Sequence, residues 1–423
     1  MNFNTALIRL GIDPSSFINE EREPIKTDNG FIYEVRQRTD IRICPKCGSV
    51  NAYINDHDVV EINCSETDQI KDILRIIKVR FKCKDCGVTY TPVIKGIDAY
   101  KKISKQTEAL IVGDFTKMMT FKAIGIRYGI STARAMQIFD EKIPYIPRGR
   151  LPKILCVDEI SFDSDINQKY CCVLYDHERR EPVDIISNRQ LPYLREYFSS
   201  IDEAERLNVR YFVSDMYDGY RRVCKDYFKY AIHIVDLFHV IKLLTVAINS
   251  LRYNYVKKHK NDKDYTITFM KAHWKLFLCR RENIPDKWYE PKGIGKSFHY
   301  SDLVFECVKR DHTLLEGYNI LQDLYHYNQC DTFMDSLKFI DYISDRLKLT
   351  GNELLSAVGY SYEKWRAEIA SGLAKNQHGS HYSNGIAESI NNHLKTIIKA
   401  AYGYHNFERF RKRAMLICRY KKI

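Results

Sequence analysis

Short apolar runs recur along the middle of the chain and predict β-strands there. They are ILCVDEISF, YCCVLYDHE, PVDIISNR, VRYFVSDMYDGY and AIHIVDLFH, between residues 154 and 239. Two helix-like segments, LPYLREYFSSIDEAERL and YRRVCKDYF, separate the third, fourth and fifth runs. The predicted order is therefore three strands followed by helix, strand, helix and strand.

This order is the one expected of an RNase H-like α/β domain, and we predict the first part of such a core at residues 151–239. From residue 240 to 375 the pattern becomes helical and rich in aromatic residues, which predicts a helical insertion. Residues 376–423 then supply the closing helices of the core. The proline- and arginine-rich linker IPYIPRGRLPK marks the boundary before the core.

Upstream of the linker, TFKAIGIRYGISTARAMQIFD predicts two helices joined by a turn at Gly129-Ile130, with Ser131 capping the second helix. This pattern is typical of a helix-turn-helix DNA-binding domain, which we place at residues 96–150. An ordinary helical hairpin is the alternative. The residues spaced for a small core are Ile124, Ile130, Ala135 and Ile138. The side chains left outward for DNA are Thr132, Arg134 and Gln137.

Two CxxC pairs, CPKCGS and CKDCGVTY, predict a zinc-binding module in residues 1–95. Each pair forms a tight turn followed by glycine, a geometry that suits tetrahedral zinc. The predicted ligands are Cys44, Cys47, Cys83 and Cys86. The 35 residues between Cys47 and Cys83 require a hairpin insertion, and ILRIIKVRFKC supplies one of its strands. A redox motif, the alternative, needs a single CxxC between a strand and a helix.

Composition favours a phosphate-rich partner and a reducing compartment. Lys and Arg total 66 against 54 Asp and Glu, a formal charge of +12. The segment from Asn391 onward holds nine Lys or Arg and a single acid, Glu408. Thirteen cysteines without a secretion signal indicate free thiols and a metal site. No apolar run is long enough to span a bilayer, so we expect a soluble, cytoplasmic protein.

Asp158 and Asp215 each lie where an apolar strand ends, in ILCVDEIS and YFVSDMYDG. A carboxylate there is costly unless its charge is compensated, and two carboxylates on separate strands of one sheet repel each other. A divalent cation resolves both costs, and oxygen ligands with open positions select Mg²⁺ or Mn²⁺. Taken alone, each aspartate could instead be a turn or cap residue. Asp236 and His239 follow the fifth strand near the same edge, where His239 could transfer a proton, contact DNA or be an ordinary hydrogen-bonded histidine.

The segment SNGIAESINNHLK adds a third carboxylate, Glu388. The helix that it begins has an apolar stripe made by Ile386, Ile390, Leu394 and Ile397. The opposite side carries Glu388, Asn391, Lys395 and Lys399. If the stripe packs on the sheet, Glu388 reaches the two aspartates as a metal ligand, and the residues after it follow a phosphate backbone. A favourable acid in the first helical turn is the alternative for Glu388.

These motifs resemble the DDE transposases of bacterial insertion sequences in the ISL3 (ISL-three) family. The resemblance covers nearly the whole chain: the double CxxC, the helix-turn-helix, VDEIS, VSDMYDGY, VDLFHV and the closing SNGIAESINNHLKTIIKAAYGYHNFERFRKRAML. The last block is the most specific, with an N-G-x-x-E run, asparagine and lysine on the same helix, a glycine–aromatic turn and a basic helix. Its residues here are Asn384, Gly385, Glu388, Asn391, Asn392, Lys395, Tyr402, Gly403 and Tyr404.

The resemblance implies that Asp158, Asp215 and Glu388 form the metal-binding triad of an RNase H-like core. It also implies that the zinc and helix-turn-helix modules bind the terminal inverted repeats of the element. Two Mg²⁺ or Mn²⁺ ions would bridge the scissile phosphate, activating water or the freed 3′-hydroxyl and stabilising the leaving oxygen. Phosphate contacts are expected from Lys395, Lys399, Arg409, Arg411, Lys412 and Arg413, and a solvated basic surface is the alternative for each.

We therefore expect a bacterial, nucleoid-associated transposase that binds inverted repeats and target DNA, with no membrane partner. Because two DNA ends must be paired, a homodimer or larger assembly on DNA is expected. The main alternative is a catalytically inactive regulator that binds DNA through its zinc and helix-turn-helix modules. A second is a structure-selective nuclease of the same fold that cuts without strand transfer.

Overall fold

The computed structural model describes residues 4, 7–8, 11–18, 23–40, 42–64, 72–97, 102–162, 169–375, 379–381, 385–400, 404 and 406–420, without the side chains of residues 386, 387 and 420. The chain forms two compact units. Unit 1 holds Met1–Pro147 and Leu394–Ile423, and unit 2 holds Arg148–Phe162 and Ile166–His393. The C-terminal segment thus belongs to the same unit as the N-terminal region. The domain boundaries expected from the sequence stay predictions.

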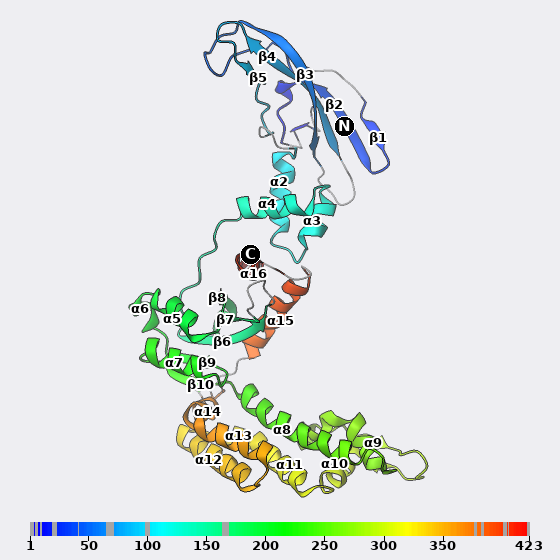
Figure 1. Ribbon diagram of the computed structural model, residues 1–423, viewed down its shortest axis with the longest axis vertical. Coiled ribbons are helices and arrows are strands. Elements are labelled where there is room, and N and C mark those ends of the chain that lie inside the picture. The colour runs from blue at the N-terminus through cyan, green and yellow to red at the C-terminus, as the bar shows by residue number, and fades with distance from the viewer. Residues whose placement is uncertain are drawn as a thin grey trace. The chain divides into compact units, whose positions relative to one another are not determined.

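Unit 1 begins with a mixed sheet, which contains both antiparallel and parallel strand pairs (Figure 1). Its elements are η1 (Pro14–Ser16), β1 (Ile25–Thr27), β2 (Gly30–Arg36), β3 (Ala52–Asn63), β4 (Ile73–Cys83) and β5 (Thr89–Tyr90). The strand order is β1-β2-β4-β3, and β5 pairs with β4. Strands β3 and β4 form one long antiparallel hairpin that runs from Ala52 paired with Cys83 to Asn63 paired with Ile73. This hairpin fills the gap between the two CxxC pairs, as the sequence predicted.

Three helices follow in unit 1: α2 (Lys105–Asp114), α3 (Phe121–Arg127) and α4 (Thr132–Lys142). The Ser131 hydroxyl accepts a hydrogen bond from the backbone N–H of Arg134 at 3.1 Å, which confirms the predicted N-cap of α4. The turn before it has Gly129 at φ +63°, a conformation that suits glycine. Gly125 lets the turn approach α3, because a Cβ there would lie 2.7 Å from the carbonyl oxygen of Ile130.

The core between these helices contains the predicted Ile124, Ala135 and Ile138, all buried, whereas Ile130 is half-buried. Three phenylalanine rings, Phe115, Phe121 and Phe139, pack edge to face beside them with centroids 5.1–5.9 Å apart.

The C-terminal helix α16 (Phe407–Tyr420) packs against α2–α4 in the same unit. Its Arg413 is 1% exposed and lies over the three phenylalanine rings. The Arg413 guanidinium donates to the carbonyl oxygens of Lys117 at 3.0 Å and Met119 at 2.8 Å. Arg413, almost 300 positions after Lys117 in the sequence, thus completes the core of the N-terminal helices.

Unit 2 contains the five predicted strands of the middle of the chain. They are β6 (Ile154–Ser161), β7 (Tyr170–Asp176), β8 (Glu181–Ile186), β9 (Tyr211–Ser214) and β10 (Ile232–Val235). The order across the sheet is β10-β9-β6-β7-β8, with β7 antiparallel to both neighbours and β6, β9 and β10 parallel. The connecting helices are α5 (Leu191–Ser199), α6 (Glu203–Arg206) and α7 (Asp218–Tyr227). Helices α5 and α7 bury Leu194, Phe198 and Val223 against the sheet residues Leu155 and Leu174.

The helical insertion leaves the sheet after β10 (Figure 1). Its helices are α8 (Leu237–Lys258), α9 (Tyr265–Ala272), α10 (Tyr300–Val308), α11 (His312–Leu324), α12 (Phe333–Leu349), α13 (Glu353–Lys364) and α14 (Arg366–Leu373). Shorter elements between them are η2 (Trp274–Phe277), η3 (Arg281–Asn283), η4 (Tyr325–Gln329) and the two-stranded hairpin of β11 (Trp288–Tyr289) and β12 (Phe298–His299). Helix α14 returns to β10 so closely that a Cβ on Gly372 would lie 2.5 Å from the carbonyl oxygen of Val235. No described helix combines the length and the hydropathy needed to cross a membrane.

Helix α15 (Gly385–Ala400) belongs to both units, with residues up to His393 in unit 2 and those from Leu394 in unit 1. Of its predicted apolar stripe, Leu394 and Ile397 are buried and Ile390 is half-buried. The side chain of Ile386 lies outside the described residues.

Candidate active site and cysteine cluster

Two aspartates stand level with each other at one edge of the unit 2 sheet. The last parallel pair between β6 and β9 joins Cys156 to Val213. Asp158 and Asp215 each come two residues later, on strands that are about 4.8 Å apart. The sequence placed Asp158 at the end of its strand, but β6 continues to Ser161, paired with β7 alone. Asp158 nevertheless lies at the edge where the parallel pairing stops, because β9 is the shorter strand.

Asp236 extends this row to a third strand. The last pair between β9 and β10 joins Ser214 to Val235, so the residue after each, Asp215 and Asp236, is again at the same level. Asp236 is buried, and its Oδ2 lies 3.1 Å from Nδ1 of His239 on the first turn of α8. The three aspartates therefore form a row across β6, β9 and β10, with an imidazole beside it.

Burial and repulsion make this row unfavourable when all its carboxylates are charged. Burial, together with the charge of Glu159, raises the pKa of Asp215 to about 6, although His239 opposes the shift. Burial also raises the pKa of Asp158, against the hydrogen bond that it accepts from the Glu159 backbone N–H. Among the described atoms, Oδ1 of Asp215 is buried and has no hydrogen-bond partner. A cation at this edge would compensate both the charge and the unpaired oxygen.

His239 responds to the negative charge of the row. Burial alone lowers the pKa of its imidazole, but the hydrogen bond with Asp236 and the charges of the three aspartates outweigh burial, and the pKa is raised overall. His239 thus lies beside Asp236 and the aspartate row, and its role there stays a prediction.

Asn391, which is 3% exposed, connects helix α15 to the sheet through hydrogen bonds. Its Nδ2 donates to Oδ2 of Asp158 at 2.7 Å, and its Oδ1 accepts a hydrogen bond from the hydroxyl of Tyr175 on β7. The sequence predicted Asn391 on the outer, DNA-contacting side of the helix, and this prediction is wrong for the structure. Asn391 lies one turn before Leu394, at the border of the apolar stripe, where the two hydrogen bonds draw it inward.

Glu388, the third predicted ligand, is exposed and lies one turn before Asn391 on the same helix. Within the described residues, the carboxylates of Asp158, Asp215 and Glu388 do not come together in the way the four predicted zinc ligands do. The structure therefore brings the two aspartates side by side and places Glu388 on the helix that contacts Asp158. Its role as a ligand stays a prediction.

Glu159, the residue after Asp158, points to other partners. Its Oε1 accepts a hydrogen bond from the Tyr220 hydroxyl at 3.1 Å, and its Oε2 pairs with Arg189. Arg189 also lies over the ring of Tyr217. Glu159 is thus neutralised by an arginine, whereas neither Asp158 nor Asp215 forms such an ion pair with a described residue.

The four predicted cysteines come together in unit 1, with all sulfurs within 4.8 Å of one another. Cys44 Sγ lies 3.6 Å from Cys86 Sγ, and Cys47 Sγ lies 3.6 Å from Cys83 Sγ. Zn–S bonds of about 2.3 Å in a tetrahedron separate the sulfurs by about 3.8 Å, close to these distances. The cluster could therefore bind zinc.

Each CxxC pair lies in a turn, and the two turns have the same backbone geometry. Gly48 and Gly87 both have φ near +70°, at +71° and +72°, and their N–H groups donate to the carbonyls of Cys44 and Cys83. Although burial raises it, backbone N–H groups bring the pKa of Cys44 down to about 7, which favours the thiolate that a metal needs. Cys64 is buried in a separate apolar core and is not part of the cluster.

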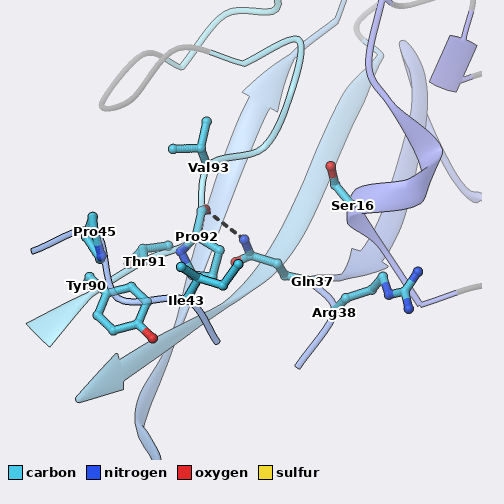
Figure 2. A pocket seen from close by; sticks show the side chains of 9 residues that line it. All are labelled: Ser16, Gln37, Arg38, Ile43, Pro45, Tyr90, Thr91, Pro92 and Val93. Carbon is cyan, nitrogen blue, oxygen red and sulfur yellow. Dashed lines mark hydrogen bonds between the residues drawn. The ribbon is translucent and has the colours of Figure 1, made fainter. Parts of the chain in front are cut away.

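A cavity of about 190 Å³ opens near the first CxxC turn (Figure 2). Its lining consists of Ser16, Gln37, Arg38, Ile43, Pro45, Tyr90, Thr91, Pro92 and Val93. The buried Gln37 is held on both sides, since its Nε2 donates to the Pro92 carbonyl at 2.9 Å and its Oε1 accepts from the Val79 N–H at 3.2 Å. The described lining offers no carboxylate, thiol or imidazole, so we assign it no chemistry.

The family model of the ISL3 DDE transposases, described as transposase, matches residues 155–414, which is more than half of the chain. The chain belongs to this family. The match spans both aspartates, the helical insertion, Glu388 and most of α16. DDE transposases use divalent metals, in agreement with the cation that would compensate the charge of the aspartate row.

The chain is also similar to a curated protein named ATP-dependent protease from Lactococcus lactis subsp. lactis. The two are 31% identical over 121 residues, which is 27% of this chain and 34% of that protein. The chain thus matches about a third of the length of this relative.

The DNA contacts that the sequence predicted on α16 are mostly turned inward. Arg411 and Arg413 are 5% and 1% exposed, and Arg411 donates to the carbonyl of Ile146 at 3.1 Å. Phosphate contact by these two arginines is therefore a wrong prediction for this structure, because their charged groups are used within unit 1. Lys412 donates to the Ile143 carbonyl at 2.8 Å.

The other predicted DNA contacts remain accessible in part. Arg409 pairs with Asp140 on the protein surface, and Lys395 and Lys399 are exposed. On α4, Thr132 and Arg134 are half-buried, whereas Gln137 is exposed and donates to Glu141 at 2.8 Å. These contacts and that of Lys412 stay predictions. Asn384, Tyr402 and Gly403 of the closing motif lie outside the described residues.

Proposed function

We propose that this transposase binds the terminal inverted repeats of an insertion sequence and catalyses metal-dependent cleavage and joining of DNA strands. The observation that carries the proposal is the half-buried pair of level aspartates, Asp158 and Asp215, and the buried, unpartnered Oδ1 of Asp215 among the described atoms. A site that concentrates negative charge in a partly buried edge is built for a cation.

The strand order supports an RNase H-like catalytic core. In chain order the sheet reads 5-4-1-2-3, with the second strand antiparallel to its neighbours. The first aspartate lies on the first strand and the second follows the fourth, so the parallel pairing alone brings them together. The helical insertion after the fifth strand leaves this edge intact and returns to it through α14.

The residues present fit Mg²⁺ or Mn²⁺. Asp158, Asp215 and Glu388 would supply oxygen ligands, and the Oδ1 of Asp215, which has no partner among the described atoms, would gain one from the cation. When bound, such ions polarise the phosphate and lower the pKa of an attacking water or 3′-hydroxyl. Since Glu388 is exposed, its carboxylate can still move toward the aspartates when DNA and metal bind.

The remaining residues of the proposed site would position the DNA backbone and neutralise its charge. His239, whose pKa is raised by the aspartates, is protonated more readily than an ordinary histidine and can hold a proton near the reacting phosphate. Lys395 and Lys399 follow Glu388 on α15 and are exposed, which suits contacts to the phosphate backbone.

Sequence recognition is proposed for unit 1. The helix–turn–helix geometry of α3 and α4, with its capped second helix, suits insertion of α4 into the major groove. Gln137 is the exposed residue of α4 best suited to reading a base edge, because its amide both donates and accepts. The zinc cluster at the base of the β3–β4 hairpin would stiffen the neighbouring module.

The name of the Lactococcus lactis relative raises a nucleotide-dependent reaction as an alternative. The segment GIGKS, from Gly293 to Ser297, resembles the end of a phosphate-binding P-loop. Glu290 stands where that motif needs its first glycine, and the segment connects strands β11 and β12 rather than a strand and a helix. We therefore do not propose ATP binding.

The test uses purified protein, DNA carrying the element's flanking ends, Mn²⁺ and a supercoiled target plasmid. A transposase yields cleaved ends that become covalently joined to the plasmid. Cleavage without joining would favour the structure-selective nuclease, and binding of the ends without cleavage would favour the regulator.

A further inference from the structure

The side chain of Asn391 links three elements of the unit 2 core in one hydrogen-bonded chain. The Tyr175 hydroxyl on β7 donates to its Oδ1, and its Nδ2 donates to Oδ2 of Asp158 on β6. The other oxygen of Asp158 accepts from the backbone N–H of Glu159 at 2.8 Å. Both Tyr175 and Asn391 are buried, so these bonds are shielded from competing water.

The direction of each hydrogen bond follows from the chemistry of the groups. An ionised Asp158 only accepts hydrogen bonds, so the amide must turn its NH₂ group toward it. The amide oxygen then faces Tyr175, and the tyrosine hydroxyl must donate. A flipped amide would place two oxygens in contact, which is unfavourable. The chain of bonds therefore has one arrangement, and it holds the Asp158 carboxylate between two N–H donors.

The same residue also sets the position of Glu388. Asn391 follows Glu388 by three residues on α15, so the two side chains lie on neighbouring positions of one helix surface. Because Asn391 contacts Asp158, the side of the helix that carries Glu388 is fixed next to the aspartate row.

We infer that Asn391 is a positioning residue of the metal site, which fixes the Asp158 carboxylate and fastens α15 so that Glu388 approaches the same cation. This inference rests on the proposed function and deepens it. Asn391 acts through Asp158 and contacts neither metal nor DNA, in contrast to the DNA contact predicted from the sequence. Groups that orient metal ligands in this way typically change metal affinity by 10- to 100-fold when they are removed.

The experiment measures Mn²⁺ binding to the full-length, zinc-loaded protein by electron paramagnetic resonance, without DNA. Four proteins are compared: the wild type, Asp215→Asn, Asn391→Ala and Asn392→Ala. Asn392 is the matched control, because it is the next residue, has the same side chain and is exposed. We expect Asp215→Asn to abolish binding, Asn391→Ala to weaken it at least 10-fold, and Asn392→Ala to leave it unchanged.

A second variant separates a specific loss of Mn²⁺ binding from a general loss of structure. Tyr175→Phe removes only the hydroxyl that orients the amide, and we expect it to weaken Mn²⁺ binding several-fold while thermal unfolding of the metal-free protein is little changed. In the cleavage assay, Asn391→Ala should lower kcat and leave the affinity for end DNA near that of the wild type.

The outcomes separate this inference from the proposed function. If the wild type binds Mn²⁺ through Asp215 but folded Asn391→Ala binds it equally well, the positioning role is overturned and the metal site stands. If the wild type itself binds no Mn²⁺ through Asp215, the proposed function fails and the inference fails with it.

Discussion

Asp215 stands level with Asp158 on the neighbouring parallel strand, and its Oδ1 is buried without a partner among the described atoms. Two carboxylates in this arrangement repel each other, and burial adds to the cost. The protein keeps a local destabilisation at this edge that a divalent cation would remove. Stability, metal binding and catalysis should therefore all change when Asp215 is altered.

The first prediction concerns pH and Asp215→Asn in zinc-loaded protein without Mg²⁺ or Mn²⁺. The pKa of Asp215 is raised from 3.8 to about 6, so the folded state binds this proton more tightly than the unfolded state between those values. The wild type should therefore lose stability relative to the variant as pH rises from about 4 to 6, by on the order of 2–3 kcal/mol.

Urea unfolding of both proteins at pH 4.5 and 7.5 measures this difference. Asp345→Asn, the same substitution at an exposed position of α12 outside the aspartate row, is the control. An Asp215→Asn difference that is the same at both pH values would contradict the electrostatic account of the row.

The second prediction concerns metal binding and the stability of the wild type. At a Mn²⁺ concentration 100 times its dissociation constant, the wild type should gain about 2.7 kcal/mol in unfolding free energy. Asp215→Asn should gain much less, because it lacks the oxygen that most needs a cation. Thermal unfolding with and without Mn²⁺ measures both, and an equal gain in the two proteins would place the bound ion elsewhere.

Several of these features could be predicted from local sequence. The apolar runs predicted all five strands of the unit 2 sheet, and Ser131 was correctly predicted as the cap of α4. Each of these depends on neighbouring residues alone, through a short continuous apolar run or a side chain that bonds three positions away. The CxxC turns and the hairpin between them were predicted for the same reason.

The errors all involve partners distant in sequence. Asn391 has a polar side chain at the border of a helical stripe, and its burial depends on Tyr175 and Asp158, more than 200 residues earlier. Arg413 belongs to a basic helix that local pattern assigns to DNA, yet its guanidinium fills a core built by residues of α2–α4. The level position of Asp236 follows from strand register, which apolar runs do not reveal.

The third prediction contrasts two arginines of α16. Arg413→Ala removes buried hydrogen bonds to two backbone carbonyls and packing against three aromatic rings, so it should lower the unfolding free energy by on the order of 2–4 kcal/mol. Arg409→Ala removes a surface pair with Asp140 and should cost less than about 1 kcal/mol. Denaturant unfolding of the two variants provides the measurement. Equal, small losses would show that α16 does not complete the core of unit 1.

The fourth prediction concerns the cysteine cluster. The wild type should contain one zinc ion per chain by elemental analysis, and Cys83→Ser should contain none, because Cys83 is both a predicted ligand and the residue that pairs with Ala52 at the end of the hairpin. Cys64→Ala alters a buried cysteine outside the cluster and should retain the zinc. Zinc retained by Cys83→Ser would refute the four-thiolate assignment.

The most direct test of the account is the joining of element ends to a target plasmid by matched glutamate variants. Glu388→Gln and Glu408→Gln make the same substitution at exposed first-turn glutamates of α15 and α16. We predict that Glu388→Gln reduces Mn²⁺-dependent joining at least 1,000-fold while end binding persists, and that Glu408→Gln joins ends like the wild type. Full joining activity in Glu388→Gln would contradict the proposed metal site and, with it, the mechanism.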